Sequence, residues 1–367
     1  GLGTAVPPAT LNQQEAQGIA ESLCCRTAEQ ATFIPAIYGG SGIVTRHTCL
    51  GRAVVRDVLD GTRFSGSPYL PTGADDDRGP TTRERLAIYE QEAPELALRA
   101  SAKALSQAGT LPTGITHLVT VSCTGFAAPG FDIALVNELG LSPDLHRTHV
   151  GFMGCHGTLN GLRVANAYAG SDPDARVLVC SVELCSLHYH YGWDPPKVVA
   201  NALFADGAGA IVGVPSARGP TGAWRLVASG SHLVPEAADA MTWTIGDYGF
   251  GMTLSKRIPD LIAGSLRAWL EGWLDKFGLK VGEVRSWAVH PGGPKVLDAV
   301  GSSLGLPPEA LWASREVLAG YGNMSSATVV FILERLIERG ASGPCVALGF
   351  GPGLNVEAAL FANGSEY

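Results

Sequence analysis

The sequence predicts a layered α/β protein made of two related units. In both halves, segments with helical periodicity alternate with short apolar segments typical of buried strands. The length of 367 residues exceeds that of one ordinary domain, and 46% hydrophobic against 16% charged residues indicates a well-buried globular protein. No convincing internal repeat is present in the residues themselves, so the duplication is inferred from the order of elements alone.

The first half is expected to contain helices and strands in turn. In order, these are helical segments over 11–38 and 82–109, a strand over 115–123, a helix over 132–139, a strand ending before Cys155, a helix over 158–170, and strands over 177–183 and 204–212. Pro94 is expected to kink the second helical segment or to start a new helix there.

The second half follows the same order of elements. We expect a helix over 258–277, a strand over 287–289, a helix over 294–304, a loop over 317–322, a helix over 325–339, a strand over 345–349, a loop over 349–353 and a strand over 356–361. The stretch 215–222 is rich in Gly and Pro and is the best domain boundary. It divides the chain into an N-terminal half, 1–218, and a C-terminal half, 219–367.

Cys155 lies between an apolar segment and a segment of helical periodicity, close to Gly154 and Gly157. This pattern indicates a strand-to-helix elbow, and the glycines leave room for a sharp turn and for a reactant against the sulfur. A thiol near a helix start feels the positive end of the helix dipole, which lowers its pKa. A buried structural cysteine is the alternative reading of this residue.

Charge and composition exclude several classes of function. The net charge of −8 argues against nucleic acid as a partner, because phosphate binding needs concentrated Lys and Arg. There is no run of eighteen apolar residues and no basic-then-apolar leader, so we expect a cytoplasmic protein without membrane contact. Cys180, Cys185, His188 and His190 match no standard zinc spacing, and we expect no metal.

Three candidate catalytic residues follow buried strands or begin helices: Cys155 as nucleophile, His290 as base and Asn323 as neutral donor. Carbon-transfer chemistry on thioesters needs a thiolate to accept an acyl group and donors to stabilise an oxyanion or enolate. The alternatives are a strand-end cap for His290 and a helix N-cap for Asn323. A papain-like hydrolase also uses Cys, His and Asn in this order, but its local cysteine motif is absent around Cys155.

Six motifs then occur in order along the chain: Gly154-Cys155, ALFADG at 202–207, WAVHPGGP at 287–294, SREVL at 314–318, YGNMSS at 321–326 and GFGPGL at 349–354. Over roughly residues 40 to 362 the sequence resembles the type III polyketide synthases, the chalcone-synthase-like branch of the thiolase superfamily. The nearest rival is a ketoacyl-acyl-carrier-protein synthase III-like enzyme, which shares Cys, His and Asn. Phe204 within ALFADG and the GFGPG segment favour the polyketide synthase.

The resemblance implies a homodimer of duplicated αβαβα subunits that needs no cofactor. Cys155 would carry the starter and the growing chain, while His290 and Asn323 would support decarboxylation of malonyl-CoA and condensation. The product would be a pyrone, a resorcinol or a related aromatic compound. The residues expected to bind substrate are Phe204, Met252, Cys123, Ala128, Cys185, His188, Trp243, Gly292, Gly293, Ser325, Gly351 and Pro352.

Some positions depart from the family pattern. Small side chains at Cys123 and Ala128 and a missing aromatic ring at Met252 suggest a tolerant cavity for medium or long acyl starters, whereas Trp243 would narrow it. The segment 33–40 carries none of the basic residues that bind CoA phosphates in the plant enzymes. Arg46 and Lys295 are possible substitutes, and an acyl carrier protein could deliver the starter instead. His156 has no evident mechanistic role.

Overall fold

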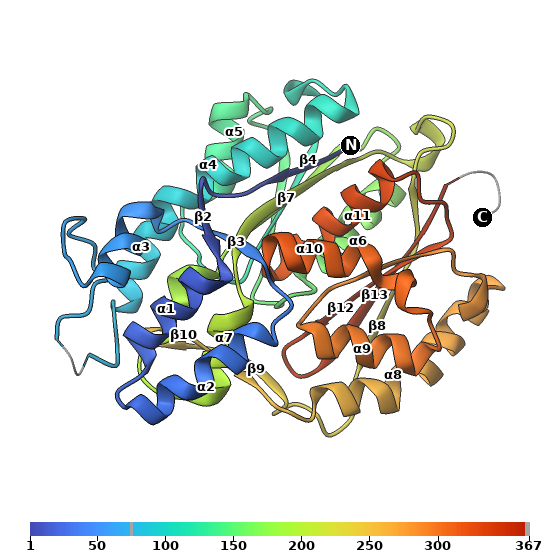
Figure 1. The fold of residues 1–367 in the computed structure, drawn as a ribbon. Helices are drawn as coiled ribbons and strands as arrows, with labels where there is room; N and C mark the ends of the chain where they lie inside the picture. Colours follow the sequence, from blue (N-terminus) through green and yellow to red (C-terminus); the bar gives the residue numbers. More distant parts are fainter. Residues whose placement is uncertain (74–75, 364–367) are drawn as a thin grey trace.

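Two β-sheets form the frame of the computed structural model, which describes residues 1–73 and 76–363 (Figure 1). The first has the strand order β1-β7-β6-β4-β5 and the second β11-β12-β13-β8. The strands of the first sheet are β1 (Leu2–Ala5), β4 (His117–Ser122), β5 (His146–Gly151), β6 (Val177–Leu184) and β7 (Asp206–Gly213). Those of the second are β8 (Arg225–Leu233), β11 (Ser286–Val289), β12 (Cys345–Gly351) and β13 (Asn355–Ala362).

Helices cover both sheets and fill the space between them. The central helices α6 (Gly157–Ser171) and α11 (Thr328–Glu338) contact strands of both sheets. The helices α4 (Thr82–Ala108) and α5 (Phe131–Leu139) lie outside the first sheet, and α8 (Ile258–Leu274) and α9 (Pro294–Leu304) outside the second. Three buried hydrophobic clusters fill the spaces between these layers. The order is therefore helix, sheet, helix, sheet, helix, which confirms the predicted layered α/β class.

Most of the remaining elements gather at one end of the sheets, beside the cavity described below, whereas α10 (Trp312–Tyr321) lies next to α11 (Figure 1). The elements at this end are β2 (Ala9–Asn12), β3 (Thr45–Thr48), α1 (Gln13–Cys24), α2 (Ala28–Gly39), α3 (Gly51–Asp60), α7 (Pro195–Leu203) and the hairpin of β9 (Met241–Gly246) with β10 (Gly249–Leu254). Both α1 and α2 begin with a capping box, at Asn12 and Thr27, which satisfies backbone donors of the first turn.

Three local predictions differ from the structure. No new helix starts at Pro94: α4 runs through it as one 27-residue helix, because its packing against the first sheet outweighs the lost hydrogen bond, and the predicted kink stays a prediction. The predicted loop 317–322 is the end of α10, which stops at Gly322 with a φ of 74°. The predicted loop 349–353 is the end of β12 and a tight turn into β13, with Gly351 opposite Asn355.

Strands β8, β9 and β10 were not predicted, because polar and glycine residues interrupt their apolar pattern. The division of the chain at residue 218 stays a prediction, and the last four residues of that C-terminal half lie outside the described residues.

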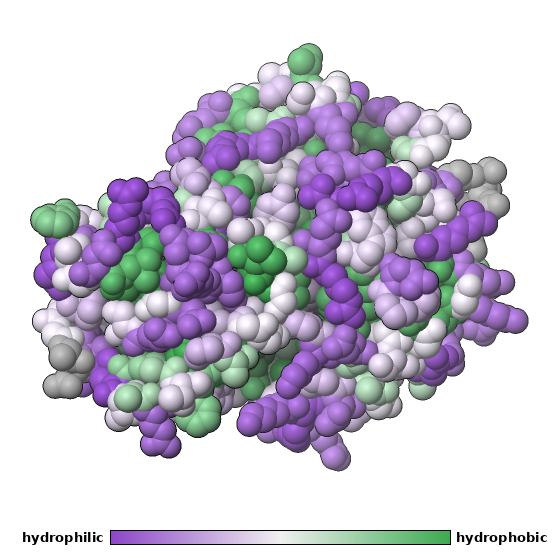
Figure 2. Space-filling view, in the orientation of Figure 1, coloured by the Kyte–Doolittle hydropathy of each residue, from purple (hydrophilic) through white to green (hydrophobic). Residues whose placement is uncertain are grey.

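No described helix is both long and apolar enough to cross a membrane. On the face shown in Figure 2, hydrophilic residues predominate and hydrophobic ones occur in small groups, as expected for helices whose apolar sides face the core.

Candidate active site

Cys155 lies in the elbow between β5 and α6, at the wall of a cavity of about 400 Å³. Its side chain is buried, and Gly154 before it has a φ of 79°, a conformation that favours glycine. A β-carbon at Gly154 would overlap Cδ of Pro352, so the turn after β12 packs directly on the elbow. The sequence prediction of a strand-to-helix elbow is confirmed.

Asn323 and Ser325 act on the Cys155 sulfur from the segment between α10 and α11. Oδ1 of Asn323 accepts a hydrogen bond from the Ser325 backbone N–H at 2.9 Å, which leaves the amide NH₂ as the donating group. Burial raises the pKa of Cys155 to about 12, while side-chain hydrogen bonds from Ser325 and Asn323 lower it. The two side chains therefore favour negative charge on the sulfur.

His290 follows β11 and is almost completely buried. Its backbone N–H donates to Leu348 O at 2.8 Å, which fixes the residue to β12. Neither ring nitrogen has a hydrogen-bond partner among the described residues, and burial lowers the pKa of His290 to about 3. Burial thus raises the pKa of the Cys155 thiol and lowers that of His290, and both shifts oppose the lowering of the thiol pKa that we expect at a helix start.

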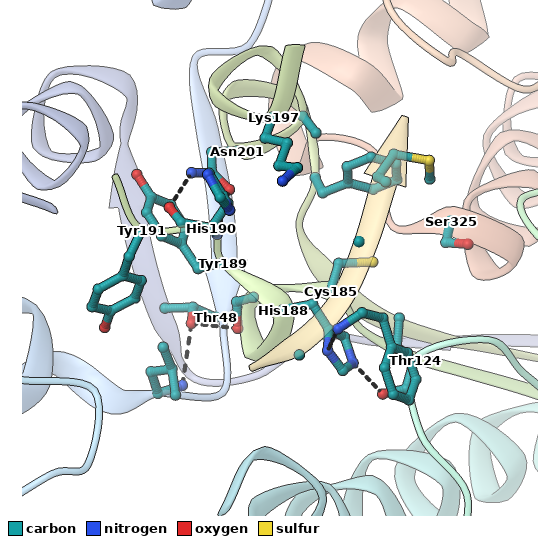
Figure 3. A pocket seen from close by; sticks show the side chains of 18 of the residues that line it. Thr48, Thr124, Cys185, His188, Tyr189, His190, Tyr191, Lys197, Asn201 and Ser325 are labelled. Atoms are coloured by element: carbon teal, nitrogen blue, oxygen red, sulfur yellow. Dashed lines mark hydrogen bonds between the residues drawn. The ribbon is translucent and has the colours of Figure 1, made fainter. Parts of the chain in front are cut away.

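Eight of the residues predicted to bind substrate line the cavity together with Cys155; Figure 3 shows part of this wall. They are Cys123, Cys185, His188, Phe204, Trp243, Met252, Ser325 and Pro352. The other four are not among its described lining residues: Ala128 lies in the loop after β4, Gly292 and Gly293 precede α9, and Gly351 ends β12. His290 and Asn323 are buried behind the lining.

His188 is held by two backbone groups and faces an aromatic cluster. Its Nε2 donates to Thr124 O at 2.6 Å and its Nδ1 accepts from the Phe250 N–H at 3.0 Å, so it is neutral; burial lowers its pKa to about 3. Trp243 stands edge-on to the His188 ring and donates from Nε1 to Cys123 O at 2.8 Å. Both His188 nitrogens are thus occupied, and the described residues contain no cluster suited to a metal ion.

Glu183 is a buried acid near Cys155 that the sequence analysis missed. It accepts hydrogen bonds from the Cys123 N–H at 3.0 Å, from Thr124 Oγ1 at 2.8 Å and from Ser326 Oγ. Burial raises the pKa of Glu183 to about 7, and its charge raises the pKa of Cys155. An acidic residue inside the otherwise apolar strand β6 was the signal available in the sequence.

The cavity has an apolar extension that was also missed. Residues of α1 and α3 line this part of the cavity, and most of them are aliphatic. The aliphatic residues of this extension are Leu11, Ala16, Ile19, Leu23, Leu50, Val54, Val55 and Val58. They come from segments far from Cys155 in sequence, so helical periodicity alone presents them as ordinary core positions.

Arg46 is not available for CoA phosphates, which corrects one expectation. Its guanidinium is buried and donates to the backbone oxygens of Asn201, Ala202 and Phe204 at the end of α7. It therefore satisfies carbonyl groups that the helix end leaves unpaired. Lys295 is exposed in the first turn of α9.

The sequence matches two family models, the N-terminal domain of chalcone and stilbene synthases over residues 1–216 and the C-terminal domain over 225–363. It is 33% identical to "Alpha-pyrone synthesis polyketide synthase-like Pks18" of Mycobacterium tuberculosis, over 98% of this chain and 90% of that protein. It is 34% identical to 1,3,6,8-tetrahydroxynaphthalene synthase of Streptomyces peucetius, over 97% and 90% of the two chains.

Solved structures agree with these relatives. PKS-I of the brown alga Ectocarpus siliculosus matches with a TM-score of 0.90 and 32% identity, over 99% of this chain and 97% of that chain. The 1,3,6,8-tetrahydroxynaphthalene synthase of Streptomyces coelicolor matches with a TM-score of 0.86 and 27% identity, over 99% and 98%. The chain therefore belongs to the chalcone and stilbene synthase family of type III polyketide synthases, enzymes with a thiolase-like fold that condense malonyl-CoA.

Proposed function

We propose that Cys155 carries an acyl starter, that malonyl units extend it iteratively, and that the product cyclises to a pyrone, a resorcinol or a related aromatic compound. The observation that carries this proposal is a thiol at the cavity wall whose sulfur has two side-chain donors, together with a buried imidazole, just outside the lining, whose nitrogens have no partner among the described residues. A buried histidine left unsatisfied in this way is ready to bind a reacting group.

In the loading step, the Cys155 sulfur attacks the carbonyl carbon of the starter thioester and the CoA thiolate leaves. His290 takes the thiol proton, because its unpaired nitrogens are the available basic atoms beside the cavity. The transfer needs no net charge to enter the buried site, since a neutral pair becomes an ion pair.

In the extension step, malonyl-CoA loses CO₂ and the electron pair of the broken C–C bond forms an enolate at the thioester. The enolate oxygen then accepts hydrogen bonds from His290 and from the amide NH₂ of Asn323. The enolate carbon attacks the acyl-Cys155 carbonyl, and the chain leaves the sulfur two carbons longer as a ketoacyl-CoA. Transfer back to Cys155 allows the next round.

The starter is an acyl chain of medium or long length in this proposal. The aliphatic extension between α1 and α3 offers apolar surface for the tail of such a chain while its carbonyl lies at Cys155. The name of the mycobacterial relative refers to α-pyrone synthesis, which supports a pyrone as one product class.

The starter is delivered by CoA or by an acyl carrier protein. Helix α2 carries no Lys or Arg, so basic groups for the CoA phosphates have to come from other elements, and Lys295 is our candidate. Titration of a Lys295→Ala variant with malonyl-CoA and with malonyl-pantetheine separates the contribution of the phosphates from that of the thioester arm.

A homodimer is also part of the proposal. Strand β5 is the outer strand of its sheet, and each of its residues is exposed or half-exposed, so it offers a free edge to a second copy. Sedimentation of the purified protein tests whether it forms this dimer.

We propose a cytoplasmic location, in keeping with CoA thioester substrates and with eight cysteines that are all free.

The deciding experiment incubates the protein with radiolabelled malonyl-CoA and with acetyl, hexanoyl, lauroyl, palmitoyl or coumaroyl-CoA, followed by mass spectrometry. Ring products several two-carbon units longer than the starter support the proposal. A single-step ketoacyl product would instead indicate a ketoacyl-acyl-carrier-protein synthase III-like reaction, and free acid alone a thioester hydrolase. Cys155→Ala should abolish condensation, whereas Cys155→Gln should keep malonyl decarboxylation.

A further inference from the structure

His156 directly follows Cys155. Its side chain is buried beside the site, and the steps proposed above do not use it. It is 2% exposed. Its Nδ1–H donates to Asn160 Oδ1 at 2.7 Å, one turn further along α6. This bond fixes the tautomer and leaves the Nε2 lone pair facing the amide NH₂ of Asn355 at 3.4 Å.

Asn355 belongs to a polar network that joins three elements. The same NH₂ group donates to Glu357 Oε1 at 2.9 Å, and Ser231 Oγ of strand β8 donates to that oxygen at 2.8 Å. The other carboxylate oxygen of Glu357, which is buried, pairs with Arg163 of α6. The network therefore ties the helix that follows the nucleophile to strands β13 and β8 of the second sheet.

The His156 ring also supports the turn between β12 and β13 sterically. A β-carbon at Gly351 would lie 2.5 Å from Nε2 of the ring, and one at Gly349 would lie 2.8 Å from Cβ of His156. Strand β12 can therefore lie this close to His156 only because glycine occupies both positions. On the other side of Cys155, Pro352 presses on Gly154 and faces the cavity.

These contacts show which part of the cavity wall depends on the His156 ring. The turn at 351–354 touches the chain on both sides of the nucleophile, at residues 154 and 156, and presents Pro352 as part of the cavity wall. The hydrogen bond toward Asn355 fixes the far end of the same turn. The position of Pro352 relative to the Cys155 sulfur thus depends on the ring of His156 and on its two polar contacts.

We propose that His156 is a positioning residue that sets the cavity wall at Pro352, and thereby the length at which the growing chain stops and cyclises. The inference rests on the proposed polyketide synthesis. His156 acts through the turn at 351–354 and contacts no reacting atom. Because His156 reaches the reacting residues only through its electrostatic effect on His290, decarboxylation of malonyl-CoA is expected to change less than the product ratio.

The test compares His156→Phe with His156→Gln by product profile and by decarboxylation. Phenylalanine keeps a ring but leaves Asn160 Oδ1 and one N–H of Asn355 without their partner. The ratio of full-length ring product to shorter products should fall about fivefold or more, the effect of losing about one buried hydrogen bond. Decarboxylation should change less than about twofold, and glutamine, which can both donate and accept, should restore much of the ratio.

A second variant keeps the ring in place in case phenylalanine is not tolerated. Asn160→Ala removes only the acceptor for Nδ1–H and should shift the product ratio in the same direction. Asn166→Ala, an exposed asparagine on the same helix, is the matched control. Asn355→Ala combined with His156→Phe should change the ratio by less than the sum of the two single effects, because the contact between the two side chains is lost in each single variant already.

Three results would overturn the proposal. The first is a product ratio that stays unchanged in both His156→Phe and Asn160→Ala. The second is a loss of decarboxylation and condensation by the same factor, with the product ratio unchanged. The third is an Asn160→Ala variant whose product profile equals that of the control Asn166→Ala. Absence of ring products from the unmodified enzyme would be a failure of the proposed function instead. The two kinds of failure are therefore separated by the activity of the parent protein.

Discussion

Phe204 and Asn323 lie side by side in an isolated parallel bridge between two chain segments that are distant in sequence. The Ala205 N–H donates to Asn323 O at 2.8 Å, and the Asn323 N–H donates to Leu203 O at 2.9 Å. The bridge joins the end of α7 to the segment after α10. The cavity residue Phe204 and the amide donor Asn323 are therefore positioned by one pair of backbone hydrogen bonds.

Asn323→Asp tests the role of the amide NH₂. The new side chain can still accept from the Ser325 N–H, so the fold should be kept, but it turns a carboxylate oxygen toward the Cys155 sulfur and the enolate. Loss of one such donor typically costs about 10² to 10³ in rate. We expect a decrease of that size in ¹⁴CO₂ release from labelled malonyl-CoA, with unchanged thermal unfolding. Release at the parental rate would exclude Asn323 as the enolate donor.

Glu183→Gln tests the electrostatic coupling between the buried acid and the nucleophile. The carboxyl has a pKa of about 7, so it is largely charged at alkaline pH, where its charge raises the pKa of Cys155. Glutamine can keep the hydrogen bond from the Cys123 N–H but carries no charge. The thiolate fraction at a given pH should therefore rise, and the curve of iodoacetamide inactivation between about pH 6 and 10 should move to lower pH. Overlapping curves, or a move to higher pH, would contradict the coupling.

The places of the candidate catalytic residues in the fold could be predicted from the sequence, because they lie at ends of elements with clear periodicity. Cys155 follows a strand and precedes a helix, and His290 follows a short apolar strand before glycine and proline. Such ends are visible in a single sequence, since apolar periodicity stops there. The same reasoning gave the alternation of helices and strands and hence the layered fold.

The cavity wall could not be predicted in full, because it depends on contacts between distant segments. Ala16 and Val58 read as ordinary core positions of amphipathic helices, yet they line the apolar extension. Arg46 was expected as a possible ligand of the CoA phosphates, although it is buried and caps the end of α7. Burial also reversed the expected direction of the Cys155 pKa, and local sequence does not reveal the depth of burial.

Arg46→Met should destabilise the protein without a specific effect on CoA. The substitution leaves the backbone oxygens of Asn201, Ala202 and Phe204 without their donor in a buried site. Each buried acceptor left unsatisfied costs about 1 to 3 kcal/mol. We expect urea unfolding to show a loss of several kcal/mol, about 3 or more. In active protein, KM for malonyl-CoA and for malonyl-pantetheine should change by the same factor, because Arg46 does not bind the phosphates; a selective rise for malonyl-CoA would contradict this.

Ala16→Trp tests whether the apolar extension between α1 and α3 holds the tail of the starter. Ala16 is buried on α1 and lines the extension, so an indole there fills space that a long chain needs and a short chain does not. The ratio of turnover with palmitoyl-CoA to turnover with acetyl-CoA should fall about tenfold, which corresponds to about 1.4 kcal/mol of lost binding to the tail. Gln14→Trp places the same ring on the exposed side of α1 and should leave the ratio unchanged. Thermal unfolding of both variants controls for overpacking. An equal loss of turnover with both starters would mean that the tail lies elsewhere in the cavity. The space between α1 and α3 would then not bind the starter.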